Sequence, residues 1–241
     1  MAFELGVVMR DVHAALAGHP YPVIMWGEEA LRRLGAPIPP GLDHEIMLVL
    51  EPCHMEDAAQ RLEESRFKRV NCSFGIHAND RIPMHAAVKR QIAHDFNTFD
   101  DWSEHYVCTR EHTSMKETIK LALIPTTYAH ISTRQHPLDD FDHMFGIYWP
   151  KPARLMISFV ETVVTGPMNG CWKRLLIMWA GYWLYQGKRL PVTVMNNSDN
   201  ENARAYFESF IRHMQFYPCQ PPVPGMEFQF VGVRVPQYLI N

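Results

Sequence analysis

Three short apolar runs, each followed closely by a glycine or a proline, constrain the fold of this chain most. They are residues 22–26 (PVIMW) before Gly27, residues 44–50 (HEIMLVL) before Pro52, and residues 118–124 (TIKLALI) before Pro125. Apolar runs of this length that end at a helix breaker are typical of buried strands. The sequence therefore predicts a sheet whose strands are distributed along the first half of the chain.

Helical periodicity fills most of the remaining chain. It predicts helices over residues 4–17, 28–34, 55–65, 153–164, 172–185 and 200–216. Asp199 or Asn200 is a suitable N-cap for the last of these helices. Short strands are expected at residues 67–70, on a sheet edge, and at residues 227–235. We expect loops over residues 71–115, with one helix near residues 85–95, and over residues 135–144.

This order of elements predicts an α/β fold with a mixed sheet in the N-terminal half and helices in the C-terminal half. Residues 1–135 would form the α/β unit, and residues 136–241 a mainly helical part packed on it. With 241 residues, 47% of them hydrophobic, the two parts are expected to form one compact domain.

Composition excludes several classes of protein. The net charge of −3 gives no overall attraction to nucleic acid. Five widely spaced cysteines without a C-x-x-C pair argue against a zinc ribbon and against a disulfide framework. No apolar stretch is long enough to span a membrane, and the N-terminal residues lack the pattern of a secretory signal. A cytoplasmic protein is therefore expected, without a membrane partner.

The acidic pair Asp43 and Glu45 carries the strongest chemical signal. Alternate residues of a strand point to the same side, so the two carboxylates are predicted to converge beside Gly27. Converging carboxylates hold divalent metals such as Mg²⁺, and they also bind a guanidinium or ammonium group. A solvated pair that forms a salt bridge to Arg32 or Arg33 is the structural alternative.

The N-terminal unit resembles the nucleotidyltransferase superfamily, especially its compact fungal-type members. The matching segments are Met25-Trp26-Gly27-Glu28 and Asp43-His44-Glu45-Ile46. The resemblance implies a nucleotidyltransferase-like sheet and a transferase that acts on a nucleotide-bearing or aminoacyl substrate. Asp43 and Glu45 would then be catalytic and hold Mg²⁺, and Gly27 and Glu28 would lie at the phosphates.

Two features depart from the pattern of the family. Glu28 follows the glycine where the family has glycine or serine, and residues 118–124 provide no third carboxylate. A non-catalytic interaction domain with the same fold therefore stays open as an alternative.

A tRNA-dependent, arginine-containing cyclodipeptide synthase is a further alternative, because those small fungal enzymes are similar in chain size. Aminoacyl-tRNA would then be the partner, and the acids at 43 and 45 would recognise a cationic side chain. Lys173 and Arg174 would contact the substrate, together with Lys188 and Arg189.

Three other groups of residues suggest sites of lower specificity. The aromatic residues of 172–185 could stack on bases, although aromatic residues at helical spacing more often form core. His136, Asp139, Asp140, Asp142 and His143 suggest either a metal site or favourable acids at a helix N-terminus. His105, Cys108 and His112 could provide a Cys/His nucleophile pair.

Overall fold

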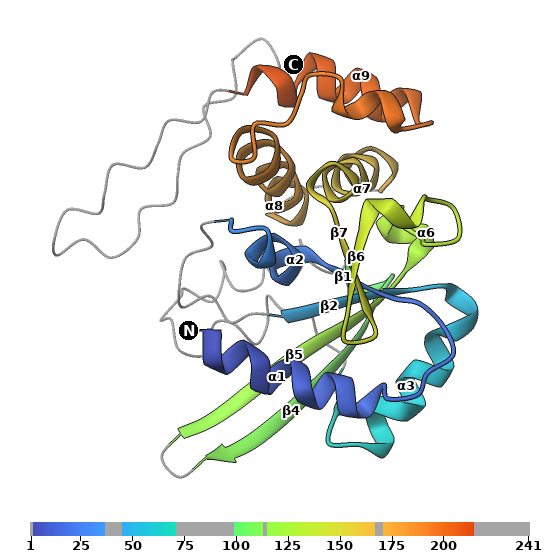
Figure 1. The fold of residues 1–241 in the computed structure, drawn as a ribbon, viewed down its shortest axis with the longest axis vertical. Coiled ribbons are helices and arrows are strands. Elements are labelled where there is room, and N and C mark those ends of the chain that lie inside the picture. The colour runs from blue at the N-terminus through green and yellow to red at the C-terminus, as the bar shows by residue number, and fades with distance from the viewer. Residues whose placement is uncertain (1, 37–44, 71–98, 113–114, 167–170, 215–241) are drawn as a thin grey trace, which may run out of the picture.

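The computed structural model describes residues 2–36, 45–70, 99–112, 115–166 and 171–214 (Figure 1). Their centre is a seven-stranded mixed sheet with the strand order β3-β4-β5-β2-β1-β7-β6. The strands are β1 (Val23–Trp26), β2 (Glu45–Leu50), β3 (Lys68–Val70), β4 (Glu104–His112), β5 (Met115–Pro125), β6 (Phe141–Met144) and β7 (Ile147–Pro150). A mixed α/β fold is confirmed.

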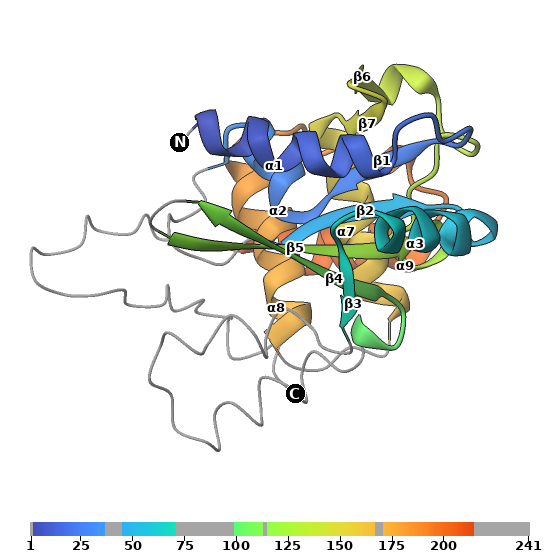
Figure 2. The same ribbon diagram turned by 90° about the horizontal axis from the view of Figure 1, so that it is seen from below.

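Helices cover both faces of this sheet. The α-helices are α1 (Ala2–Ala15), α2 (Gly27–Arg33), α3 (Met55–Glu64), α6 (Thr126–Ala129), α7 (Pro152–Thr165), α8 (Cys171–Met178) and α9 (Glu201–Ser209). A π-helix, η3 (Trp179–Gln186), continues α8, and short 3-10 turns occur at η1 (Pro52–His54), η2 (Leu138–Asp140), η4 (Val194–Asn197) and η5 (Ile211–His213). Figure 2 shows α1 and α8 on opposite sides of the sheet.

An aromatic cluster joins the sheet to the C-terminal helices. The indole of Trp26 is fully buried and lies 5.1 Å from the ring of Phe159 and 6.3 Å from those of Trp172 and Trp179, between ring centroids. Its Nε1 donates a hydrogen bond of 2.8 Å to Ser158 Oγ. The helical aromatic residues nearest the sheet are therefore core, because Trp172 and Trp179 expose no surface for a base to stack on.

Most elements expected from periodicity are present within one to three residues of their expected bounds. β1, β2, β5, α1, α2, α3 and α7 confirm the corresponding predictions, and β3 is an edge strand as expected. Asn200 is the N-cap of α9, since its side chain accepts a hydrogen bond from the backbone N–H of Ala203 at 3.1 Å. The expected helices over 172–185 and 200–216 end or change type earlier, at Met178 and Ser209.

The loop predictions were wrong at two places. Residues 104–112 form β4, which pairs with β5 along its whole length, and residues 141–144 form β6. β4 places Tyr106 and Cys108 in the core, but polar residues before and after them concealed its alternation. The helix expected near residues 85–95 and the strand expected at 227–235 lie outside the described residues.

The β6-β7 hairpin links the second half of the chain to the sheet. β7 pairs in parallel with β1, with Val23 opposite Ile147 and Ile24 opposite Tyr148. The described parts of 1–135 and 136–241 therefore share one sheet, and the boundary at residue 135 stays a prediction. Across the described segments, no helix combines the length and the apolar character needed to cross a membrane.

Candidate functional site

Gly27 and Glu45 lie at the same end of two neighbouring central strands, β1 and β2. β1 and β2 are antiparallel, with Trp26 opposite Met47, so that β1 ends where β2 begins. Gly27 has a φ of +65°, and a Cβ atom at this position would lie 2.5 Å from the Sδ of Met47. Glycine is required here for two reasons, because other residues rarely adopt this φ and because the side chain of Met47 occupies the space.

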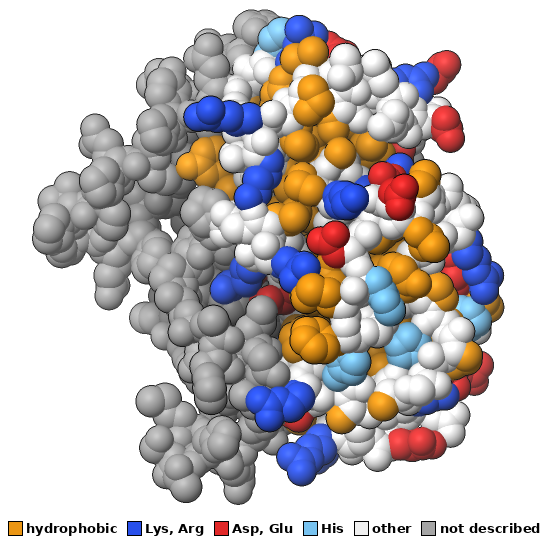
Figure 3. Space-filling view, in the orientation of Figure 1, with side chains coloured by type: hydrophobic (Ala, Val, Ile, Leu, Met, Phe, Trp, Pro, Cys, Tyr) orange, Lys and Arg blue, Asp and Glu red, His pale blue; other side chains and the backbone are white. Residues whose placement is uncertain are grey.

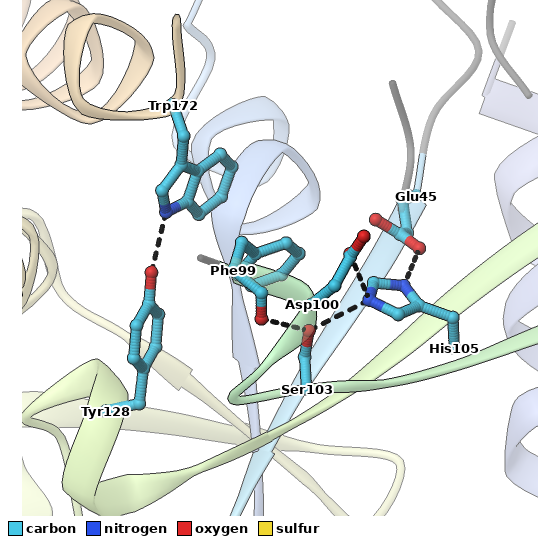
Figure 4. Close-up of polar contacts among 7 residues, drawn as sticks. All are labelled: Glu45, Phe99, Asp100, Ser103, His105, Tyr128 and Trp172. Atoms are coloured by element: carbon cyan, nitrogen blue, oxygen red, sulfur yellow. Dashed lines mark hydrogen bonds and ion pairs between the residues drawn. The ribbon is translucent and has the colours of Figure 1, made fainter. Parts of the chain in front are cut away.

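Glu45 is a buried carboxylate with one bound and one unbound oxygen. The residue is only 3% exposed, and its Oε1 lies 2.8 Å from Nδ1 of His105 (Figure 4). Its Oε2 is also buried and has no hydrogen-bond partner among the described residues. A buried polar atom without a partner costs free energy, so this oxygen marks an unusual position in the described structure.

His105 joins Glu45 to a second carboxylate. Its Nε2 lies 3.0 Å from Asp100 Oδ1 and 2.8 Å from Ser103 Oγ, and this hydroxyl donates to the backbone oxygen of Phe99 at 2.7 Å (Figure 4). Burial by itself lowers the pKa of His105, but the hydrogen bonds and charges of Asp100 and Glu45 outweigh it and raise the pKa to about 9. The imidazole is therefore protonated at neutral pH.

The row Ser103, His105 and Glu45 has the order of a nucleophile, a base and an orienting acid. A protonated imidazole between two carboxylates cannot accept a proton from Ser103 at neutral pH, so the row is not a nucleophilic triad. The role that fits His105 is to hold Glu45 in place and offset its charge. Cys108 does not pair with His105, since residues three apart on a strand point to opposite faces; the side chain of His112 lies outside the described residues.

A lysine lies beside Glu45 on the next strand. β2 and β5 are parallel, with Glu45 opposite Lys120, and Lys120 is 6% exposed. In the nucleotidyltransferase pattern this later strand carries the third carboxylate. With imidazolium on one side of Glu45 and an ammonium group on the neighbouring strand, the described residues do not fit a pair of divalent metals. Within the described ranges, which do not include Asp43, no cluster of three His, Cys, Asp or Glu residues is placed to hold a metal ion.

The other residues of the predicted site have different surroundings. Asp43 lies outside the described residues, so its convergence with Glu45 stays a prediction. Glu28 is buried in the first turn of α2, directly after Gly27. Lys173 is half-buried and Arg174 is exposed, both on α8.

Aromatic contacts connect the start of α8 to the His105 cluster. The ring of Phe99 stacks on Trp172 at 4.3 Å and meets His105 edge-on at 5.5 Å. Trp172 Nε1 donates a hydrogen bond of 2.7 Å to the hydroxyl of Tyr128 (Figure 4). Lys173 and Arg174 follow Trp172 on α8 but point to other sides of the helix, since neighbouring helical residues do not share a face.

The predicted ion pair between Glu45 and Arg32 or Arg33 was wrong. Arg32 lies 3.5 Å from Glu29, and Arg33 lies 3.6 Å from Asp142. Among the described residues, both arginines therefore pair with acids other than Glu45, and pairing with Asp43 stays a prediction. Glu45 receives its positive partner, His105, from β4 instead.

The acidic segment near residue 140 is structural. Arg154 donates two hydrogen bonds, of 2.9 and 2.7 Å, to Asp140 Oδ2, and His136 Nδ1 lies 2.9 Å from the backbone oxygen of Ser132. Asp139 and Asp140 lie in the first turn of η2, which agrees with the helix-terminus alternative. Arg154 is buried, so it does not contribute to an exposed basic patch.

Sequence reasoning missed Asp100 and Ser103 and gave His105 the wrong role. The available signal was the alternation of Tyr106 and Cys108 with His105 and Val107, which marks a strand and places His105 on the face of Glu45. No local motif signals a contact between residues 45 and 105.

Comparisons with known proteins give little further information. No protein-family model and no curated protein matches the chain. Two solved structures from Helicobacter pylori are similar to it. JHP933 has a TM-score of 0.40 at 12% identity over 81% of this chain and 71% of its own. A protein described provisionally as a nucleotidyltransferase has a TM-score of 0.39 at 12% identity over 81% and 73%. Likeness at this level does not decide a family or an activity.

Proposed function

We propose that this chain is a transferase-like enzyme. It would bind a nucleotide-bearing or aminoacyl substrate at the end of the sheet where β1 ends and β2 begins. One observation carries the proposal: a carboxylate that is 97% buried keeps its Oε2 without a partner, beside the glycine turn. Gly27 and Glu45 also resemble the nucleotidyltransferase pattern, and this resemblance supports a substrate site at the same end of β1 and β2.

Glu45 provides a fixed hydrogen-bond acceptor in this proposal. His105 occupies Oε1 and orients the carboxylate, so Oε2 can accept a hydrogen bond from a hydroxyl, ammonium or guanidinium group of the substrate. Lys173 and Arg174, the basic residues in the first turn of α8, would contact the phosphates in this proposal.

A magnesium ion is a separate part of the proposal. Glu45 Oε2 and Asp43 are the residues that would hold one ion, and it would supply charge neutralisation for a phosphate group. The imidazolium of His105 weakens the attraction of Glu45 for a metal cation, so no step of the proposed chemistry depends on the metal.

Isothermal titration calorimetry of the whole chain tests the proposal. The four nucleoside triphosphates, each with and without Mg²⁺, and arginyl-tRNA are titrated into the wild type and Glu45→Gln. We expect one of these ligands to bind, and its affinity to fall at least tenfold in Glu45→Gln. Glu56→Gln is the matched control, because Glu56 is an exposed glutamate on α3.

The pattern of binding separates the alternatives. Binding of arginyl-tRNA, with a new dipeptide in cells that express the chain, would favour the arginine-containing cyclodipeptide synthase. Binding of a triphosphate would favour a nucleotidyl transferase. If no ligand binds, or if Glu45→Gln leaves binding unchanged, the transferase proposal is wrong and the non-catalytic interaction domain remains.

A further inference from the structure

A cavity lies at the opposite end of β1 from Glu45. It has a volume of about 400 Å³ between the end of α1, the segment that follows it and the turn of the β6-β7 hairpin. Its lining residues are Val12, His13, Leu16, Ala17, Gly18, His19, Pro20, Tyr21, Pro22, His143, Phe145, Gly146, Ile147 and Tyr148. The volume is within the range of small-molecule sites. Figure 3 shows histidine side chains among hydrophobic ones on this face.

The residues that line the cavity have apolar, aromatic or imidazole side chains. Among the described residues that line the cavity, none is an aspartate, glutamate, lysine or arginine. Three imidazoles and three other aromatic rings provide most of the functional groups. The cavity therefore offers no permanent charge to a phosphate, a carboxylate or an ammonium group, but offers planar faces and imidazole nitrogens.

The imidazoles are held in position by neighbouring rings. His13 meets Phe145 edge-on at 6.0 Å, and His143 lies 4.5 Å from Tyr148. His19 stacks on Tyr21 at 5.0 Å. A wall of fixed rings favours a rigid planar ligand, because such a ligand loses little conformational entropy on binding.

Two imidazoles of the lining have a buried nitrogen without a hydrogen-bond partner among the described residues, Nδ1 of His19 and Nε2 of His13, and His13 provides the contact proposed here. Its Nε2 is buried and has no hydrogen-bond partner among the described residues. A Cβ atom at Gly146 would lie 3.9 Å from this nitrogen, so the turn of the hairpin lies close to this edge of the ring. Because His13 lines the cavity, a ligand that enters between its ring and the hairpin turn would complete this unsatisfied nitrogen with an N–H or an acceptor atom.

We propose that this cavity binds an uncharged heteroaromatic compound that hydrogen-bonds to His13 Nε2. This cavity is separate from the proposed substrate site at Glu45, because it lies at the other end of β1. Phe145 is 76% exposed at the turn of the hairpin, where it stands over the rim of the cavity beside His13.

Saturation-transfer NMR with the whole chain tests this proposal. The probes are indole and adenine, as uncharged heteroaromatic rings, with benzoate, benzylamine and cyclohexanol as charged or non-aromatic comparisons. We expect saturation transfer to indole or adenine and none to the three comparison compounds. Binding of benzoate or benzylamine as strongly as the neutral rings would overturn the proposed ligand class.

Two matched variants locate the binding. Ala17, in the turn after α1, is exposed and lines the cavity, whereas Ala14, on α1, is exposed and does not line it. Ala17→Trp should fill the cavity and weaken binding of the ring probe at least tenfold, and Ala14→Trp should leave it unchanged. His13→Phe keeps a ring and removes Nε2, so it should also weaken binding.

Circular dichroism of each variant confirms that it folds. Absence of binding by both rings, equal binding by Ala17→Trp and Ala14→Trp, or undiminished binding by a folded His13→Phe protein would each show that the proposal is wrong.

Discussion

His105 Nδ1 lies 2.8 Å from Glu45 Oε1, although 60 positions separate the two residues. The contact exists because β5 lies between β2 and β4 in the sheet and places both side chains on one face. Asp100 completes the group on the other nitrogen of the ring, 3.0 Å away. Two carboxylates and one imidazolium thus form a buried, mutually dependent cluster.

Removal of the imidazolium should strongly destabilise the protein. His105→Gln leaves Glu45 buried without its positive partner, and loss of one partner from a buried ion pair costs about 3–5 kcal/mol. We expect the free energy of unfolding in urea at pH 7 to fall by about 3 kcal/mol. The double variant Glu45→Gln/His105→Gln should lose less than the sum of the single changes; strict additivity would show that the pair is not coupled.

The same cluster predicts a loss of stability in alkaline solution. The pKa of His105 is raised from 6.5 to about 9 in the folded protein, so its stabilising effect is complete below pH 6.5 and is lost as the pH rises through 9. The expected loss is about 3 kcal/mol. Urea unfolding from pH 6 to pH 10 should show the stability difference between the wild type and His105→Gln shrinking over this range. A difference independent of pH would contradict a protonated His105.

The glycine turn predicts a local steric effect. In Gly27→Ala, the new Cβ meets Met47 Sδ and the residue must keep a φ of +65°. We expect a loss of about 2 kcal/mol in unfolding free energy, of which the backbone conformation contributes about 1 kcal/mol. Gly18→Ala is a useful control, since Gly18 also has a positive φ but no atom within 4 Å of the added Cβ. Gly27→Ala should therefore be the more damaging change.

The buried hydroxyl of Ser158 links the sheet to α7. It accepts a hydrogen bond from Trp26 Nε1 and donates one to the backbone oxygen of Ala129. Ser158→Ala leaves both groups buried without this partner, and we expect a loss of about 1–3 kcal/mol in thermal or urea unfolding. Ser209→Ala changes an exposed serine and should cost less than about 0.5 kcal/mol. Equal losses in the two variants would disprove the role of the buried hydroxyl.

The sequence by itself determined the local elements of this protein. The apolar runs that end at Gly27, Pro52 and Pro125 identified three strands of the sheet, because hydrophobic patterning and helix breakers act over a few neighbouring residues. It also placed Glu45 and Gly27 near each other, since both follow from the strand-turn-helix-strand order. The aromatic residues of 172–185 were correctly expected to be mostly core.

Tertiary structure alone decided the surroundings of Glu45. The partners His105 and Asp100, and the neighbour Lys120, come from strand pairings between distant segments, and no local pattern specifies which strands pair. β4 was missed for the same reason, because its polar residues are accommodated only once it pairs with β5. Burial then fixed the chemistry: away from water, a carboxylate requires a positive partner, and the fold provided it from a distant strand.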